Sequence, residues 1–387
     1  MKFNKWTLGL AAVGAVSLTS VAQAEEKMML GSQAAAGLTS TTISGYVDTS
    51  AHWNIGRLNF NPPTGSSRAD GFNLNVIQVS LSKALDESEW ASGYRADLWF
   101  GPDANLLDSQ SSDGHVSSDF NIRQAYVALR TPVGNGIDWK VGVFDTIVGY
   151  ETIEDGNNPN YTRSLGFALE PTTHTGLLGT YRFCDSLSAS LGVADSFGPT
   201  INGRDNTGVN GNESRKTYMG SVALTAPSDW GWVAGSSLYL GTITGFDDNG
   251  NGKDGSREHY YAGLTLATPV AGMKVGAAFD YSHSKHIQAG VDNNYVYGLY
   301  ASFQATEKLS IHGRAEYQRT QDGAPAGQPA DRSEFTLTAQ YDLWKNVISR
   351  AELRWDHAEN NAFAVNGGAT EGDKNTYLAA LNLIYKF

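Results

Sequence analysis

Sixteen strand-like segments, joined by connections that alternate in length, limit what this chain can fold into more than any other feature. Connections after even-numbered segments are short, whereas most of those after odd-numbered segments span about ten to 26 residues and are rich in Gly, Asn, Asp and Ser. Up-and-down barrels alternate short turns with long loops, and Greek-key sandwiches have no reason to do so. The sequence therefore predicts an all-β fold, an up-and-down antiparallel barrel of about 16 strands over residues 41–387. The segments are 41–55, 72–84, 90–101, 121–131, 137–145, 172–183, 186–197, 217–226, 231–244, 257–268, 273–284, 293–305, 309–319, 332–342, 347–357 and 374–387.

Most of these segments alternate apolar with polar residues. In 347–357, Arg350, Glu352 and Arg354 alternate with Leu353 and Trp355. A charge on a lipid-facing strand costs roughly 2–4 kcal/mol at mid-membrane, so the charged face of a spanning barrel must point inward. We therefore expect a polar interior, wide enough at about sixteen strands to hold an aqueous channel. Apolar and polar residues alternate poorly in segments 217–226 and 231–244. Gly-rich strands that face another protomer would show the same pattern.

The start of the chain has the pattern of an export signal. Lys2 and Lys5 precede an apolar run over 6–21, and Ala22 and Ala24 form an A-x-A cleavage pattern, so 1–24 is predicted to be a signal peptide rather than a membrane helix. Residues 25–40 are expected to be a small-residue linker. After residue 25 no run approaches the ~18–20 apolar residues of a membrane helix, so a membrane-spanning chain would have to be a closed barrel.

Charge and cysteine content narrow the function classes. Cleavage after residue 24 would leave 26 of the 28 Lys and Arg against 40 Asp and Glu, a balance that argues against a nucleic-acid partner. The single Cys184 excludes an intrachain disulfide framework and a multi-cysteine metal site.

The C-terminal segment 374–387 ends on an aromatic residue, with Tyr385 and Phe387 on one face. Soluble chains seldom end this way, because termini usually fray. The segment resembles the terminal strand of outer-membrane barrels, which closes the barrel and carries the signal read by the assembly machinery. A half-buried edge strand of a soluble sandwich is the alternative.

The third long connection, 146–171, differs from the other long loops in its apolar content. A long loop of this kind usually packs on another part of the protein. It also bears Glu151, Glu154 and Asp155. An external lid or a contact between protomers would also explain its composition. The apolar residues are Ile147, Val148, Tyr150, Tyr161, Leu165, Phe167 and Leu169.

Three stretches, 46–53, 142–151 and 174–181, carry a family resemblance. Their sequences YVDTSAHW, GVFDTIVGYE and HTGLLGTY resemble the OmpL-like β-barrel porins, and the likeness covers nearly the whole mature chain. The resemblance implies a non-enzymatic outer-membrane channel for small hydrophilic solutes and ions, without a cofactor. It also implies contact with outer-membrane lipids, lipopolysaccharide and the barrel assembly machinery. A homotrimer is plausible by analogy with general porins.

In general porins the third loop folds into the lumen and sets its narrowest point, so 146–171 is expected to be the constriction loop. We hypothesise that its acids face Arg95, Arg314, Arg350 and Arg354 across the opening, because rings of charge set ion preference. The alternative is that these charges pair and brace the wall. The expected pore-wall residues are Asp48, Arg95, Asp97, Lys140, Arg314, Glu316, Arg350, Glu352 and Arg354.

The sequence also contains candidates for two other kinds of site. Asp247, Asn249, Asn251 and Glu258 fit the spacing of a calcium loop, but no helices flank it, so a polar surface turn is the preferred interpretation and no metal site is predicted. The eight His residues lie in no recognisable Ser/His or metal motif. A structural or adhesive barrel without an open channel, and a barrel-type hydrolase, are the alternatives to a channel.

Overall fold

The computed structural model describes residues 41–55, 70–86, 88–107, 109, 118–206, 214–246, 256–288, 290–321, 331–359, 363–365 and 368–387. The signal peptide and linker predicted for 1–40 lie outside these residues. No helix in the described ranges is long and apolar enough to cross a membrane.

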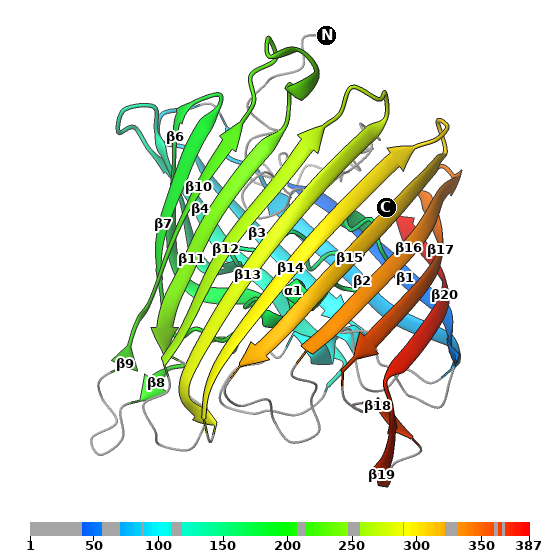
Figure 1. Cartoon of the computed structure of the whole chain (residues 1–387). Helices are drawn as coiled ribbons and strands as arrows, with labels where there is room; N and C mark the ends of the chain where they lie inside the picture. Colours follow the sequence, from blue (N-terminus) through cyan, green and yellow to red (C-terminus); the bar gives the residue numbers. More distant parts are fainter. Residues whose placement is uncertain are drawn as a thin grey trace.

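A closed antiparallel barrel forms the body of the protein (Figure 1). Each barrel strand pairs with the next along the chain, except that β10 follows β7 because β8 and β9 form a separate two-stranded sheet. The predicted barrel of 16 strands is confirmed. The strands are β1 (Thr42–Ile55), β2 (Gly71–Lys83), β3 (Ser92–Phe100), β4 (Phe120–Thr131), β5 (Ile137–Asp145), β6 (Thr173–Cys184), β7 (Leu187–Ala194), β10 (Thr217–Thr225), β11 (Ser237–Phe246), β12 (Ser256–Ala267), β13 (Met273–Gln288), β14 (Gly290–Gln304), β15 (Leu309–Gln321), β16 (Asp331–Trp344), β17 (Val347–Ala358) and β20 (Asn375–Lys386).

Short elements occupy several connections. Two hairpins extend from long connections, β8 (Asp205–Asn206) with β9 (Ser214–Arg215) and β18 (Phe363–Val365) with β19 (Gly368–Asp373). The helical turns are η1 (Pro102–Leu106), η2 (Asp155–Asn157), α1 (Leu165–Leu169) and η3 (Gly231–Val233).

The first and last strands close the barrel. β1 pairs with β20 from Tyr46 opposite Lys386 to Ile55 opposite Tyr377. The backbone of Phe387 extends this ladder, since its N–H and C=O both bond to Gly45 at 2.9 Å. The two ends of the barrel domain therefore meet at the end where the connections are short.

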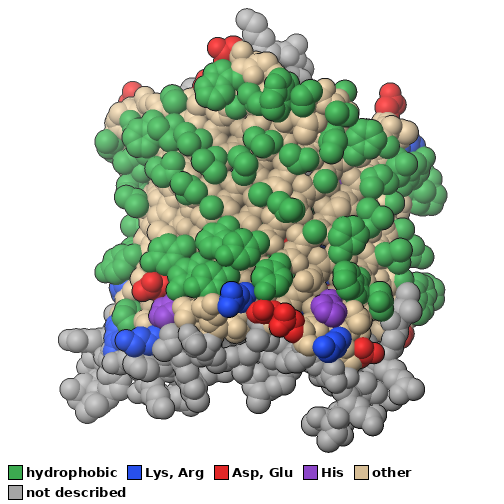
Figure 2. Space-filling model, in the orientation of Figure 1, with side chains coloured by type: hydrophobic (Ala, Val, Ile, Leu, Met, Phe, Trp, Pro, Cys, Tyr) green, Lys and Arg blue, Asp and Glu red, His purple; other side chains and the backbone are tan. Residues whose placement is uncertain are grey.

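The outer and inner faces follow the predicted alternation in β17. Arg350, Glu352 and Arg354 are buried inside, whereas Leu353 and Trp355 project outward and are 60% and 38% exposed. Figure 2 shows hydrophobic side chains across the outer wall, with charged side chains mainly near its two ends. This distribution is typical of a surface in contact with lipid hydrocarbon, where a charged side chain has a much higher free-energy cost than an apolar one.

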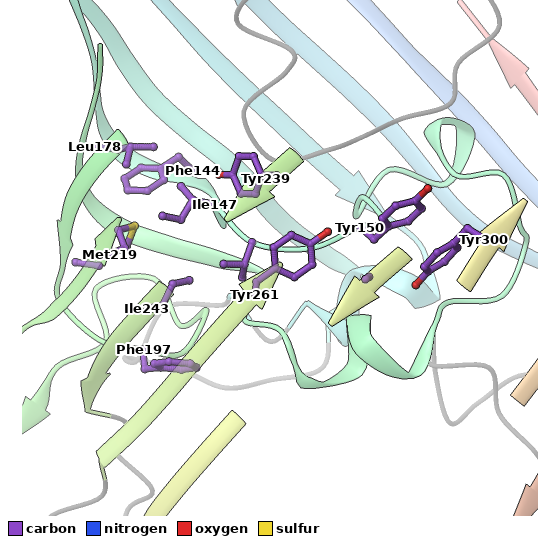
Figure 3. Packing of buried hydrophobic residues seen from close by; sticks show 13 residues of the cluster. Phe144, Ile147, Tyr150, Leu178, Phe197, Met219, Tyr239, Ile243, Tyr261 and Tyr300 are labelled. Carbon is purple, nitrogen blue, oxygen red and sulfur yellow. The ribbon is translucent and has the colours of Figure 1, made fainter. Parts of the chain in front are cut away.

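Half of the interior is apolar rather than charged. Leu178, Met219, Tyr239, Ile243 and Tyr261 point inward from β6, β10, β11 and β12 and join one buried cluster (Figure 3). Inner-face apolar residues here explain why segments 217–226 and 231–244 alternate poorly. Their inner side chains contact protein instead of water, so neither face needs to be polar.

Two connections differ most from the sequence prediction. The connection predicted at 227–230 reaches residue 236, because η3 (Gly231–Val233) stands where a strand was expected, and Gly231 and Gly235 adopt φ values of 63° and 77° that favour glycine. The connection predicted over 285–292 is instead mostly strand, since β13 continues to Gln288 and β14 starts at Gly290.

Candidate functional site

The third long connection, residues 146–172 between β5 and β6, folds into the barrel and is hereafter the third loop. Its Tyr150 stacks on Tyr300 of β14 with ring centroids 3.8 Å apart. Its Glu154 instead bonds Arg95 of β3 at 2.8 Å. Because β3 and β14 stand well apart around the wall, the loop crosses the lumen between them.

The first part of the loop is held by apolar packing. Ile147, Val148 and Tyr150 are at most 4% exposed and belong to the buried cluster lining β6–β14 (Figure 3). Gly149 has φ of 118°, and a Cβ there would lie 2.3 Å from Oε2 of Glu170, so the turn into the lumen requires glycine. These apolar residues of the loop are therefore buried inside the barrel.

Arg314 of β15 joins the loop to the opposite wall. Its guanidinium donates to Glu151 of the loop at 2.6 Å and to Glu334 of β16 at 3.1 Å. It also donates to the carbonyl of Thr162 at 2.8 Å. The side chains of Arg314, Glu151 and Glu334 are all fully buried. Arg314 and Glu151 are thus in direct contact, and no opening separates them.

Wall acids bind backbone N–H groups of the loop. Glu352 accepts from the backbone of Tyr161 at 2.6 Å and of Thr162 at 2.9 Å. Glu316 accepts from the backbone of Leu165 at 2.5 Å. Since most of this segment has no secondary structure to pair its buried backbone, charged wall residues provide the bonds instead.

Wall arginines bind the carbonyl groups of the same segment. Arg350 donates to the carbonyls of Asp155 at 3.1 Å and Asn158 at 2.5 Å, and Arg354 donates to that of Arg163 at 2.6 Å. Arg350 and Arg354 therefore lie beneath the loop and hold it, as Arg314 does. Of the four arginines expected to face the loop acids across an opening, these three support the loop directly.

A charge network on β3–β5 surrounds the fourth arginine. Arg95 contacts Asp97 and Glu154, both at 2.8 Å. Arg123 contacts Asp97 at 3.0 Å, Asp145 at 2.8 Å and Glu154 at 3.1 Å. Glu154 therefore links the loop to the wall through two guanidinium groups.

Sequence reasoning did not identify Arg123. The pairing of β3 with β4 shifts register, with Asp97 opposite Gln124 and Leu98 opposite Ile122. Arg123 is the extra residue of this bulge, and it points inward together with Gln124. Strict alternation places neighbours on opposite faces, so Arg123 could have been found only by testing each strand for an interrupted period.

An open space of about 160 Å³ remains between the third loop and the wall formed by β3, β4 and β5. Arg95, Lys140 and Asp145 border it from the wall, and Glu154 borders it from the loop. Glu151 also borders this space, but its side chain is fully buried against Arg314. The third predicted loop acid, Asp155, pairs with Arg163 of the loop itself at 2.6 Å.

Two predicted groups lie away from this space. Asp48 of β1 accepts from Asn75 of β2 at 2.8 Å and from Asn382 of β20 at 2.5 Å, so it braces the closing strands. Tyr385 and Phe387 are each 49% exposed at the short-turn end of the closing strand.

Glu170 at the end of the third loop has an unusual environment. Removal from water, followed by the nearby charges of Asp280 and Glu151, raises the pKa of Glu170 well above that of an ordinary carboxyl group. Burial also raises the pKa of Tyr150 to about 12.

In the ranges that the structure describes, no three His, Cys, Asp or Glu side chains group as metal ligands. Asp247, Asn249 and Asn251 of the possible calcium loop lie outside these ranges. Glu258, at the start of β12, accepts a hydrogen bond from Tyr260 at 3.1 Å.

A 16-stranded barrel with a loop folded into its lumen defines the class of bacterial outer-membrane porins. Residues 40–387 match the family described as Putative beta-barrel porin-2, OmpL-like, and the chain belongs to that family.

Solved structures with the same fold include two porin-type barrels. The anion-selective porin from Comamonas acidovorans is 15% identical and aligns over 90% of this chain and 99% of that chain, with a TM-score of 0.58. A loop L8 deletion mutant of OmpT from Vibrio cholerae is 12% identical over 90% of this chain and 99% of that chain, with a TM-score of 0.56. No curated protein matches the chain by sequence.

Proposed function

We propose that the chain is a non-enzymatic outer-membrane porin through which small hydrophilic solutes and ions diffuse passively. The observation that supports this most is the space bordered by Arg95, Lys140, Asp145 and Glu154, because it lies between the third loop and the wall and is lined by charged side chains. A loop packed tightly against this part of the wall would leave no such space. In this proposal Glu154, and not Glu151 or Asp155, is the loop acid that solutes meet.

The proposal includes the route to the membrane. Residues 1–24 would direct export and be removed, and the strand ending at Phe387 would be read by the barrel assembly machinery. The apolar outer wall would contact lipids and lipopolysaccharide (Figure 2). Homotrimer formation is part of the proposal by analogy with general porins, and OmpT of Vibrio cholerae, an outer-membrane protein with the same fold, is described in a trimer form.

Conductance in a planar lipid bilayer tests the proposed channel. The purified barrel should give stable single-channel steps on the order of nanosiemens or below, as expected for a barrel of this size narrowed by a loop. A folded, heat-modifiable barrel that gives no steps at any voltage would contradict diffusion through the lumen.

A structural barrel without an open channel has one observation in its favour. The third loop contacts inner faces around much of the circumference, including Gln78 of β2, Thr265 of β12, Thr338 of β16 and Lys386 of β20. Deleting residues 152–163 distinguishes the two functions. Conductance only after the deletion would identify the loop as a plug, whereas steps in both proteins would support a porin.

A further inference from the structure

Positive and negative side chains inside the barrel are not equally paired. Arg95, Arg123 and Arg314 each contact at least two carboxylates within 3.8 Å. Lys140 of β5 makes no ion pair or hydrogen bond with any residue that the structure describes, and its ammonium nitrogen lies over the ring of Tyr126, 5.0 Å from the centroid. Lys140 is therefore a cation without a bound counter-charge.

The strand pairing places Lys140 inside the barrel. It lies opposite Ala128 of β4 and Leu178 of β6, which are 8% and 1% exposed and point inward. Residues directly opposite in an antiparallel pair share one face of the sheet. The side chain borders the space beside the third loop, where the carboxylates of Glu154 and Asp145 already bind Arg95 and Arg123.

Two further unpaired cations lie on the inner face nearer the short-turn end. Arg182 of β6 is opposite Ser188, two pairs beyond the inward Thr180 and Ser190 and so on the same face, and Lys274 of β13 is opposite the buried Ser302. Neither guanidinium nor ammonium group makes an ion pair within the described ranges. Lys274 is exposed and Arg182 half-buried, so both are accessible to the lumen.

Acidic groups at this end do not cancel these cations. Asp138 is bound to Arg130 at 2.6 Å. Among the described residues, Asp342 of β16 lies on the inner face here and makes no ion pair, and it stands beside β17, away from β5 and β6. Lys386 adds a fourth cation, whose ammonium group donates to the carbonyl of Gly156 at 2.8 Å.

We propose that Lys140, with Arg182 and Lys274 behind it, makes the channel conduct small anions in preference to cations. This inference rests on the proposed porin function and assigns its solute class, namely inorganic anions and small carboxylates. A unit charge about 4 Å from a passing ion changes its local concentration roughly fivefold even in bulk water, and rings of charge at a narrow place set selectivity. The paired arginines contribute less, because their carboxylate partners offset them.

Reversal potentials in a KCl gradient across a planar bilayer test this assignment. We expect the wild-type channel to favour chloride over potassium, and Lys140→Gln to lower the chloride-to-potassium permeability ratio roughly twofold to fivefold. Lys274→Gln should lower it by less, because Lys274 does not border the space beside the third loop. Lys308→Gln is the matched control, since Lys308 lies in an exposed turn over the ring of Tyr341 and should leave the ratio unchanged.

The outcomes separate the inference from the function on which it rests. Cation preference in the wild type, or a ratio equal in wild type and Lys140→Gln, overturns the assignment while the single-channel steps still support a porin. Absence of steps in the wild type overturns the porin function itself. If Lys140→Gln does not fold, as judged by heat-modifiable migration, Lys274→Gln decides, and an unchanged ratio there rejects the basic lumen.

Discussion

Replacement of Arg314 by Met should release the third loop from the wall without unfolding the barrel. The buried guanidinium is the shared partner of Glu151, Glu334 and the carbonyl of Thr162. Removing one partner of a buried ion pair costs roughly 3–5 kcal/mol, because the remaining charges stay buried without compensation. Divided by about 1.4 kcal/mol per factor of ten, this cost lowers the ratio of docked to released loop roughly 100-fold or more. The backbone ladder of β15 is unaffected by the substitution, so the strands should remain paired.

Trypsin and single-channel recording measure the release. Arg163 of the loop is 1% exposed and should be protected from trypsin in the wild type. In Arg314→Met, mass spectrometry should detect cleavage after Arg163, and single-channel steps should become larger or unstable. Arg319→Met is the control, because Arg319 is exposed on the same strand. Adding Glu151→Gln to Arg314→Met should restore part of the protection, since it removes one uncompensated charge.

A protected Arg163 and unchanged conductance in Arg314→Met would refute this account. The loop would then be held mainly by the apolar contacts of its first part, and the buried charges would be secondary.

Three other substitutions test the charge network on β3–β5, the buried Glu170 and the closing strands. Glu154→Gln removes the carboxylate between Arg95 and Arg123, so the chloride-to-potassium permeability ratio should rise, opposite to the effect of Lys140→Gln, and an unchanged ratio would place Glu154 off the conduction path. The pKa of Glu170 in the folded protein is higher than its value of about 4.3 in the unfolded chain, so ionisation is less favourable in the folded state. The free energy of unfolding should therefore fall as the pH rises from about 4.3 to the pKa of the folded state. Near pH 4, Glu170→Gln and the wild type should unfold at similar temperatures, and at higher pH the variant should unfold at the higher temperature. Unfolding temperatures that change with pH in the same way in both proteins would contradict the raised pKa of Glu170. Gly45→Val should lower the yield of heat-modifiable barrel, because a Cβ there lies 2.1 Å from the carbonyl of Gln78 and 2.6 Å from the ring of Phe387, whereas Gly313→Val meets nothing within 4 Å and should fold normally.

The barrel could be read from the sequence because its signals are local. Alternation places Leu353 outside and Arg354 inside β17 without knowledge of any other strand, and turn composition sets the connection lengths. The errors lie where a local signal was weak. Gly231 starts a short helical turn that the residue periodicity does not predict. β13 and β14 continue through most of the segment 285–292, which was expected to be a loop.

The structure shows where the predicted site residues lie, and their role in a channel stays a prediction. Glu151, Arg314, Arg350 and Arg354 are on the inner face as expected, but they touch each other or the loop backbone instead of facing open solvent. Sequence spacing gives the face of a strand, and it does not give the depth to which a loop descends. That depth decides whether a charge borders a channel or supports a loop.

The sequence by itself determined the barrel, its 16 strands, its closing strand at Phe387 and an inward-facing set of charges, because periods of two and turn residues act within a few neighbours. The tertiary structure alone decided that the third loop crosses the lumen, that Arg123 turns inward at a bulge and that Lys140 keeps no bound carboxylate. These features depend on contacts between residues up to about 200 positions apart, such as Arg350 with Asp155. Closure of the barrel brings such residues together, and a pattern over a few neighbouring residues cannot predict contacts between residues so far apart in the sequence.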